Sequence, residues 1–124
     1  VKIVTIQACG QPVNRHTLEN QLYGGVIQGI GYAMFENRWL DRNTGGLVNP
    51  NLEFYKIPGT KDIPEIVAVA AVGDTDTGVR SVGEPATIPT SAAIANAVAN
   101  ATGARVRSLP ITPQRVLEAL AEKG

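Results

Sequence analysis

The sequence predicts a mixed α/β domain of the α+β type, in which helices are layered on a mixed sheet. Apolar and polar residues alternate over residues 1–8, and an apolar run fills residues 65–72, which are both patterns of strands. Three further segments, at residues 18–36, 89–102 and 113–120, repeat apolar residues at helical spacing. Because these elements follow one another in 124 residues without a linker, we expect a single domain over residues 1–124.

The first strand leads through a short turn into a long helix. Either Asn14 or Thr17 can cap this helix, because a short side-chain oxygen accepts a hydrogen bond from a free N–H group of the first turn. An apolar stripe follows and predicts a helix that ends near Glu36. The stripe consists of Leu18, Leu22, Val26, Ile30, Ala33 and Met34.

The same helix contains four glycines: Gly24, Gly25, Gly29 and Gly31. Each glycine in a helix interior lowers stability by about 1 kcal/mol relative to alanine, so the four together lower it by about 4 kcal/mol. Bare backbone of this kind predicts that another element or a ligand approaches the helix closely. For any one of the glycines, close packing of the helix on the sheet is the simpler interpretation.

The middle of the chain predicts a hairpin and then a buried strand. One hairpin strand runs through Trp39, the turn covers residues 43–46, and a return strand follows. An irregular segment with three prolines then leads to the strand at residues 65–72.

The last third of the chain predicts two helices. An alanine-rich helix begins at Pro89 and Thr90, and Gly103 fits a left-handed stop after it. Its apolar face consists of Ile94, Ala97, Val98 and Ala101. A final amphipathic helix starts at residues 112–113, and the residues expected to face inward are Val116, Leu117 and Leu120.

Composition excludes several classes of function. Eleven basic and eleven acidic residues cancel, so the chain has no charge surplus for nucleic acid or an anionic membrane. One cysteine, Cys9, excludes a disulfide framework, a cysteine zinc site and an iron–sulfur cluster bound by this chain alone. His16 is the only histidine, which excludes a histidine-based triad within the chain, and we expect it to cap or flank the first helix.

The start of the sequence indicates a fragment, or a processed or cloned domain. The chain begins inside a predicted strand without methionine, and it has neither a signal peptide pattern nor an apolar stretch long enough to span a bilayer.

Polar residues outside the elements offer few candidates for chemistry. Asp74 and Asp76 lack the later acidic ligand of a calcium loop, so we expect a solvated loop there. Ser81 and Ser91 have no neighbouring base and are not expected to be nucleophiles.

Glu84 is the most unusual acidic residue, because it lies between Gly83 and Pro85. It could serve as a general base, as an acid beside a metal or as a structural carboxylate. Sequence pattern alone favours the structural alternative, since isolated acidic residues usually have that role.

Three blocks of the sequence, in series, resemble the C-terminal end of the molybdenum-cofactor-binding subunit of the xanthine dehydrogenase/aldehyde oxidase family. The first is ENQLYGGVIQGIGYAMFE, which resembles the glycine-rich helix of that family. The second is LVNPNLEFYKIPGTKDIPEI, and the third runs from SVGEPATIP to LPITPQRVLEAL. Residues 8–15 depart from the family pattern at Ala8, Gln11 and Arg15 and give no guide to substrate.

The resemblance implies a role for three residues. The glutamate of the Gly-Glu-Pro motif is the catalytic base of the family and corresponds to Glu84, while Gly83 belongs to the same cofactor-facing loop. This base takes a proton from the hydroxide on the metal, which attacks a carbon of an N-heterocycle or aldehyde. The glutamine that opens the glycine-rich block lies near the molybdopterin and corresponds to Gln21.

The resemblance also implies cofactors and partners. The complete enzyme would contain a molybdenum–molybdopterin cofactor, in plain or dinucleotide form, with a 2Fe-2S cluster and FAD on other segments or subunits. This chain by itself is expected to bind none of them, because the other pterin-binding segments would lie in the remainder of the subunit. We expect a small-molecule substrate and a cytoplasmic location, or a periplasmic one if the assembled complex is exported. The alternative function is a non-catalytic module that uses the same fold for assembly or subunit contact.

Overall fold

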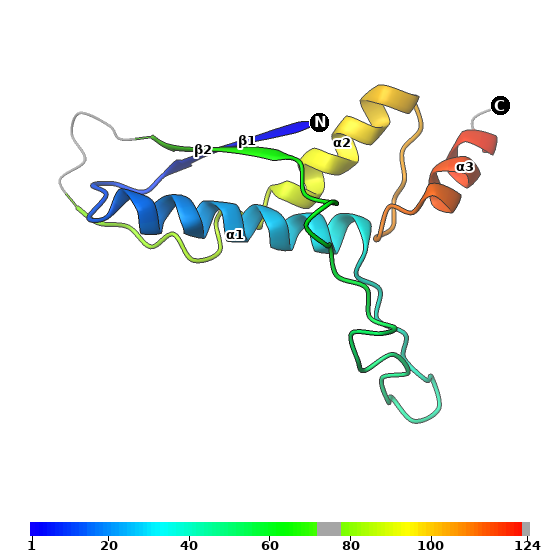
Figure 1. Ribbon diagram of the computed structural model, residues 1–124. Helices are drawn as coiled ribbons and strands as arrows, with labels where there is room; N and C mark the ends of the chain where they lie inside the picture. The colour runs from blue at the N-terminus through cyan, green and yellow to red at the C-terminus, as the bar shows by residue number, and fades with distance from the viewer. Residues whose placement is uncertain (72–77, 123–124) are drawn as a thin grey trace.

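Two parallel strands and three helices make up the described part of the chain. The computed structural model describes residues 1–71 and 78–122. Its elements are β1 (Lys2–Ala8), α1 (Arg15–Met34), β2 (Glu65–Ala71), α2 (Thr90–Thr102) and α3 (Pro113–Ala121) (Figure 1). All five lie where the sequence predicted them, within three residues. The predicted α/β class is therefore confirmed, while the loop with Asp74 and Asp76 lies outside the described residues.

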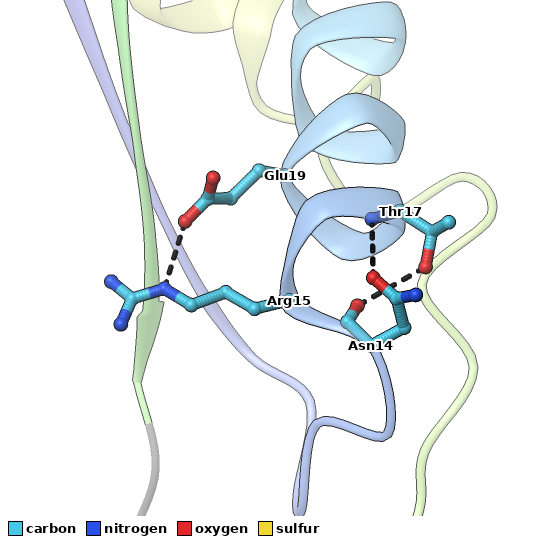
Figure 2. A network of polar contacts seen from close by, with 4 residues as sticks. All are labelled: Asn14, Arg15, Thr17 and Glu19. Carbon is cyan, nitrogen blue, oxygen red and sulfur yellow. Dashed lines mark hydrogen bonds and ion pairs between the residues drawn. The ribbon is translucent and has the colours of Figure 1, made fainter.

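A side-chain cap determines where α1 begins. The Asn14 side chain accepts a hydrogen bond from the Thr17 N–H at 3.1 Å, and the Thr17 hydroxyl donates to the Asn14 carbonyl at 3.1 Å (Figure 2). Arg15 and Glu19, one turn apart, form an ion pair of 2.9 Å beside this cap. Such a cap stabilises a helix by about 1 kcal/mol. His16 lies exposed in the same turn and does not cap the helix.

The sheet is smaller than the predicted mixed sheet, because in the described residues it has two strands. Strands β1 and β2 run parallel, in register from Lys2 opposite Glu65 to Ala8 opposite Ala71. An ion pair of 2.9 Å between Lys2 and Glu65 stands at the first register position.

One face of this sheet packs on α1, and the other face is open. Ile3 and Ile66 pack against a core of buried residues that α1 supplies, chiefly Leu22, Val26 and Ile30. The opposite face presents Val4 and Ile6, whose exposed fractions are 55% and 67%. Parallel sheets normally have both faces covered, so this open apolar face is suited to a further layer of protein.

The predicted hairpin strands are reduced to one bridge. Leu40 and Leu47 pair in antiparallel fashion, and Gly45 turns the chain between them with φ +71°. This segment projects away from the sheet and helices as an arm (Figure 1). Among the described residues no third strand supports the pair, and isolated two-stranded ribbons are marginal in water. The base of the arm is held by the buried Asn49, whose side chain accepts from the Trp39 N–H at 3.0 Å.

Helix α2 ends as predicted, and its apolar face is only partly covered. Gly103 has φ +73° and donates its N–H to the Ala99 carbonyl at 2.7 Å, which is a left-handed stop. Ile94 packs on the core, whereas Ala97 and Ala101 are exposed and line, with β1, an apolar groove of about 750 Å³.

The prediction that Leu117 and Leu120 of α3 face inward was wrong. Their exposed fractions are 67% and 38%, because α3 stands apart from the sheet and α1 (Figure 1). The segment before α3 makes the contact instead, since Ile111 is buried and donates its N–H to the Ala33 carbonyl at 2.6 Å. No helix in the described ranges is long and apolar enough to cross a membrane.

The open sheet face generates a first prediction. We expect residues 1–124, prepared as a separate chain, to self-associate, because burying Val4 and Ile6 against a second copy removes apolar surface from water. Ile6→Lys should shift the chain toward monomer in sedimentation equilibrium. Val13→Lys is the matched control, since Val13 is 85% exposed but lies outside this face. A wild-type chain that stays strictly monomeric at high concentration would contradict the prediction.

Candidate active site

Glu84 lies at the first position of a tight turn just before α2. Pro85 occupies the second position, where proline favours a turn, and the Thr87 N–H donates to the Glu84 carbonyl at 2.9 Å. The Glu84 side chain is exposed, and no hydrogen bond or ion pair to its carboxylate exists within the described residues. The carboxylate is therefore accessible from solvent in the described part of the chain.

The turn that carries Glu84 is seated on the bare backbone of α1. A Cβ atom placed on Gly25 would lie 2.8 Å from the Ala86 Cβ, and one on Gly29 would lie 2.5 Å from the Thr90 Cβ. Both distances are shorter than real contacts allow, so the approach requires glycine at these two positions. Ala86 and Thr90 are buried as a result, with exposed fractions of 1% and 5%.

Two of the four helix glycines take part in this close contact. Gly25 and Gly29 allow close approach by the turn after Glu84 and the start of α2, and not by the sheet. Gly24 faces open space, because a Cβ there would meet no atom within 4 Å. The sequence indicated that another segment approaches the helix closely. It did not indicate which of the four glycines that segment contacts, because each of them interrupts the helix in the same way.

Polar side chains join the same two segments. The Thr87 hydroxyl donates to Gln28 Oε1 at 3.2 Å, and Gln28 Nε2 donates to the Tyr32 hydroxyl at 2.6 Å. The Ser91 hydroxyl donates to the Gly29 carbonyl at 3.2 Å. Ser91 therefore has a structural hydrogen bond, which agrees with the expectation that it is not a nucleophile. Gln28 and Thr87 were not among the residues predicted from the sequence, because nothing local marks two residues 59 positions apart as partners.

Gln21 lies on α1, one turn before Gly25, and is exposed. It lines a hollow of about 250 Å³ together with Val82, which precedes Glu84 by two residues. The polar residues that share this hollow are Gln11, Asn14, Thr17 and Arg80. The fold therefore brings Gln21 and the start of the Glu84 loop to one surface.

Gly83 is exposed and its conformation is not left-handed. A Cβ placed there would meet nothing within 4 Å, so neither backbone geometry nor packing in the described residues requires glycine at this position. Its predicted part in cofactor binding stays a prediction. In the described part of the chain, no three His, Cys, Asp or Glu residues are placed to hold a metal ion.

Comparison with known sequences indicates one family. The molybdopterin cofactor-binding domain family matches residues 1–64. The chain is 39% identical over 120 residues to the xanthine dehydrogenase molybdenum-binding subunit of Escherichia coli O157:H7, covering 94% of this chain and 16% of that protein. It is 37% identical over 124 residues to the aldehyde oxidoreductase molybdenum-binding subunit of Escherichia coli K12, covering 96% of this chain and 17% of that protein. The chain thus spans less than a fifth of the length of these relatives.

Solved structures show the same fold. Quinoline 2-oxidoreductase from Pseudomonas putida 86 matches with a TM-score of 0.84 and 30% identity, over 96% of this chain and 16% of that one. Aldehyde oxidoreductase from Desulfovibrio desulfuricans matches with a TM-score of 0.80 and 36% identity, over 94% of this chain and 13% of that one. The arrangement of sheet and helices is therefore one that larger oxidoreductases contain.

The glycine contact generates a second prediction. Gly24→Ala and Gly25→Ala both gain about 1 kcal/mol of helix propensity, so their difference isolates the contact with the turn. We expect Gly25→Ala to be less stable than Gly24→Ala by about 1–3 kcal/mol, because its new methyl group overpacks against Ala86 and the Thr87 N atom. Urea unfolding of both variants measures the difference. Equal free energies of unfolding would show that the turn can move away from α1 without loss.

Proposed function

The chain belongs to the molybdopterin cofactor-binding family of xanthine dehydrogenase and aldehyde oxidoreductase subunits, and we propose that it contributes the catalytic base of a molybdenum hydroxylase. The proposed enzyme hydroxylates an electron-poor carbon of an N-heterocycle or an aldehyde, with water as the source of oxygen. Glu84 is the proposed base. The observation that carries the proposal is an exposed carboxylate, without a partner in the described residues, on a turn seated against α1.

The chemistry of Glu84 follows from this setting. A carboxylate that is free of salt bridges can accept a proton at one Oε atom, and a general base must lie within hydrogen-bond reach of the proton it removes. Close packing of Ala86 on Gly25 limits how far the turn can shift. A base held within about 0.5 Å of its productive position is what efficient proton transfer requires.

The hollow beside Gln21 fits one wall of a cofactor site. Its volume of about 250 Å³ is below the range of about 300–1,000 Å³ for complete small-molecule sites, so further segments would have to close it. The side-chain amides of Gln21 and Gln11 both donate and accept hydrogen bonds, which suits a polar ligand such as a pterin. When bound, the molybdenum cofactor supplies the redox centre that takes two electrons from the substrate. Gln21 would hold and orient it.

Partners of the chain follow from the same proposal. The chain spans 16% of the length of its xanthine dehydrogenase relative, so we propose that the rest of the molybdenum-binding subunit covers the open sheet face. The 2Fe-2S cluster and FAD would reside on other segments or subunits and accept the electrons.

A second candidate function is assembly without catalysis. The open face with Val4 and Ile6, and the apolar groove between β1 and α2, would serve subunit contact whether or not Glu84 reacts. Turnover per bound molybdenum separates the two functions, because an assembly module affects only how much cofactor is retained.

A third prediction concerns Gln21. In the complete enzyme, Gln21→Ala should reduce turnover per molybdenum by a few-fold to about tenfold, since a hydrogen bond contributes about 0.5–1.5 kcal/mol. The domain should remain folded, because the side chain is exposed and lies outside the core. Gln114→Ala on α3 is the control, and its kinetics should stay those of the wild type. Wild-type kinetics in Gln21→Ala as well would show that Gln21 is only a surface residue of the helix.

A fourth prediction concerns Glu84. Glu84→Gln keeps the shape of the side chain but cannot accept a proton, and loss of a general base costs about 10²–10⁴-fold in rate. The complete enzyme with Glu84→Gln should therefore fold, retain molybdenum and lose at least about 100-fold in turnover per molybdenum.

Glu118→Gln is the matched control for this substitution. Glu118 is an exposed acid on α3, and its neutral replacement should leave turnover per molybdenum unchanged. If Glu84→Gln instead lowers thermal stability or cofactor retention while turnover per molybdenum stays normal, Glu84 is a structural carboxylate.

A further inference from the structure

We propose that Gln28 and Thr87 are positioning residues that fix the direction in which the Glu84 side chain extends from its turn. This inference rests on the proposed role of Glu84 as the base. Neither residue is placed to react, because the Thr87 hydroxyl and the Gln28 amide bond to each other. Their effect on the reaction would pass through the backbone of Glu84.

Thr87 links α1 to the backbone of Glu84 by two hydrogen bonds. Its N–H donates to the Glu84 carbonyl at 2.9 Å and closes the turn. Its hydroxyl donates to Gln28 Oε1 at 3.2 Å, on a helix that lies 59 residues earlier in the chain. A displacement of Gln28 is therefore transmitted to the turn that carries Glu84.

A second hydrogen bond holds the Gln28 amide beside Thr87. Its Nε2 group donates to the Tyr32 hydroxyl at 2.6 Å, one helical turn further along α1. With Nε2 directed to Tyr32, the oxygen of the amide accepts from Thr87. Tyr32 thus restrains the side chain that holds the turn.

Packing and hydrogen bonding restrain the turn in different ways. The contacts of Ala86 with Gly25 and of Thr90 with Gly29 set how deeply the turn sits on α1. These contacts limit how far the turn can shift, but dispersion attraction has little directional preference. The hydrogen bond from Thr87 to Gln28 is directional, and it adds to the bond from Ser91 to the Gly29 carbonyl in fixing how the turn is oriented on α1.

The exposure of this link distinguishes positioning from stabilisation. Gln28 and Tyr32 are exposed, and the core of the fold is formed by other residues of α1. Removing the link should leave the domain folded. Proton transfer is more sensitive, because a misplacement of about 1 Å in a reacting group can reduce rate by about 100-fold.

The experiment uses the complete, molybdenum-loaded enzyme and two pairs of variants. Thr87→Val keeps the shape of threonine without its hydroxyl, and Thr87→Ser restores a hydroxyl. Gln28→Leu removes the amide, and Gln28→Glu restores an acceptor oxygen. Turnover per molybdenum and hydrogen exchange of the backbone amides of residues 86–91 are measured for each.

We expect Thr87→Val and Gln28→Leu each to lower turnover per molybdenum by about 3- to 10-fold, the effect of one hydrogen bond. Hydrogen exchange in residues 86–91 should become faster. Thr87→Ser and Gln28→Glu should recover at least half of the lost activity. The double variant Thr87→Val/Gln28→Leu should be no worse than the poorer single variant, because both substitutions remove the same bond.

Three results would overturn the inference. Turnover and exchange that match the wild type in Thr87→Val and Gln28→Leu would show that the turn is held without this bond. Additive losses in the double variant would show that the two residues act separately. Failure of Thr87→Ser and Gln28→Glu to recover activity would assign the losses to side-chain shape.

Glu84→Gln distinguishes failure of this inference from failure of the proposed function. If Glu84→Gln is inactive while the positioning variants behave as the wild type, only the inference is wrong. If Glu84→Gln retains turnover per molybdenum, the base assignment is wrong and the inference falls with it, whatever hydrogen exchange reports about the turn.

Discussion

The close approach between α1 and the turn after Glu84 is the constraint on which the rest of this structure depends. One side of helix α1 packs against the sheet, and the turn after Glu84 packs on Gly25 and Gly29 of the same helix. Helix α1 therefore holds the sheet and the turn in place. The close approach is possible because Gly25 and Gly29 have no side chain. The lost helix propensity of about 1 kcal/mol per glycine is offset by the burial of Ala86 and Thr90 that the contact permits.

Different parts of α1 make different contacts. Its first turns, capped by Asn14, present Gln21 to the hollow beside the Glu84 loop, while its middle carries the glycine contact and Gln28. Because a helix is rigid over this length, Gln21 and the support of the proposed base share one element. Their separation is therefore set by helix geometry, whereas sites built from separate loops can drift apart.

The open surfaces of the chain agree with a site that is completed elsewhere. The sheet has an apolar outer face, the groove beside α2 is apolar, and Leu117 of α3 is exposed. Solved structures of larger oxidoreductases contain the same arrangement, which covers 16% and 13% of their chains. A small hollow and uncovered apolar faces are what one wall of a larger site would present when viewed by itself.

The sequence by itself determined the elements and the candidate residues. Local signals are short-range, and Asn14, Gly103 and Pro113 each mark a helix end that the structure retains. Sequence motifs likewise singled out Glu84 and Gln21. Only the tertiary structure decided which glycines receive the turn, that Leu117 lies outside the core, and that Gln28 meets Thr87 across 59 residues. The physical reason is that periodicity and capping depend on neighbours in sequence, whereas contact between distant segments depends on how the finished layers pack.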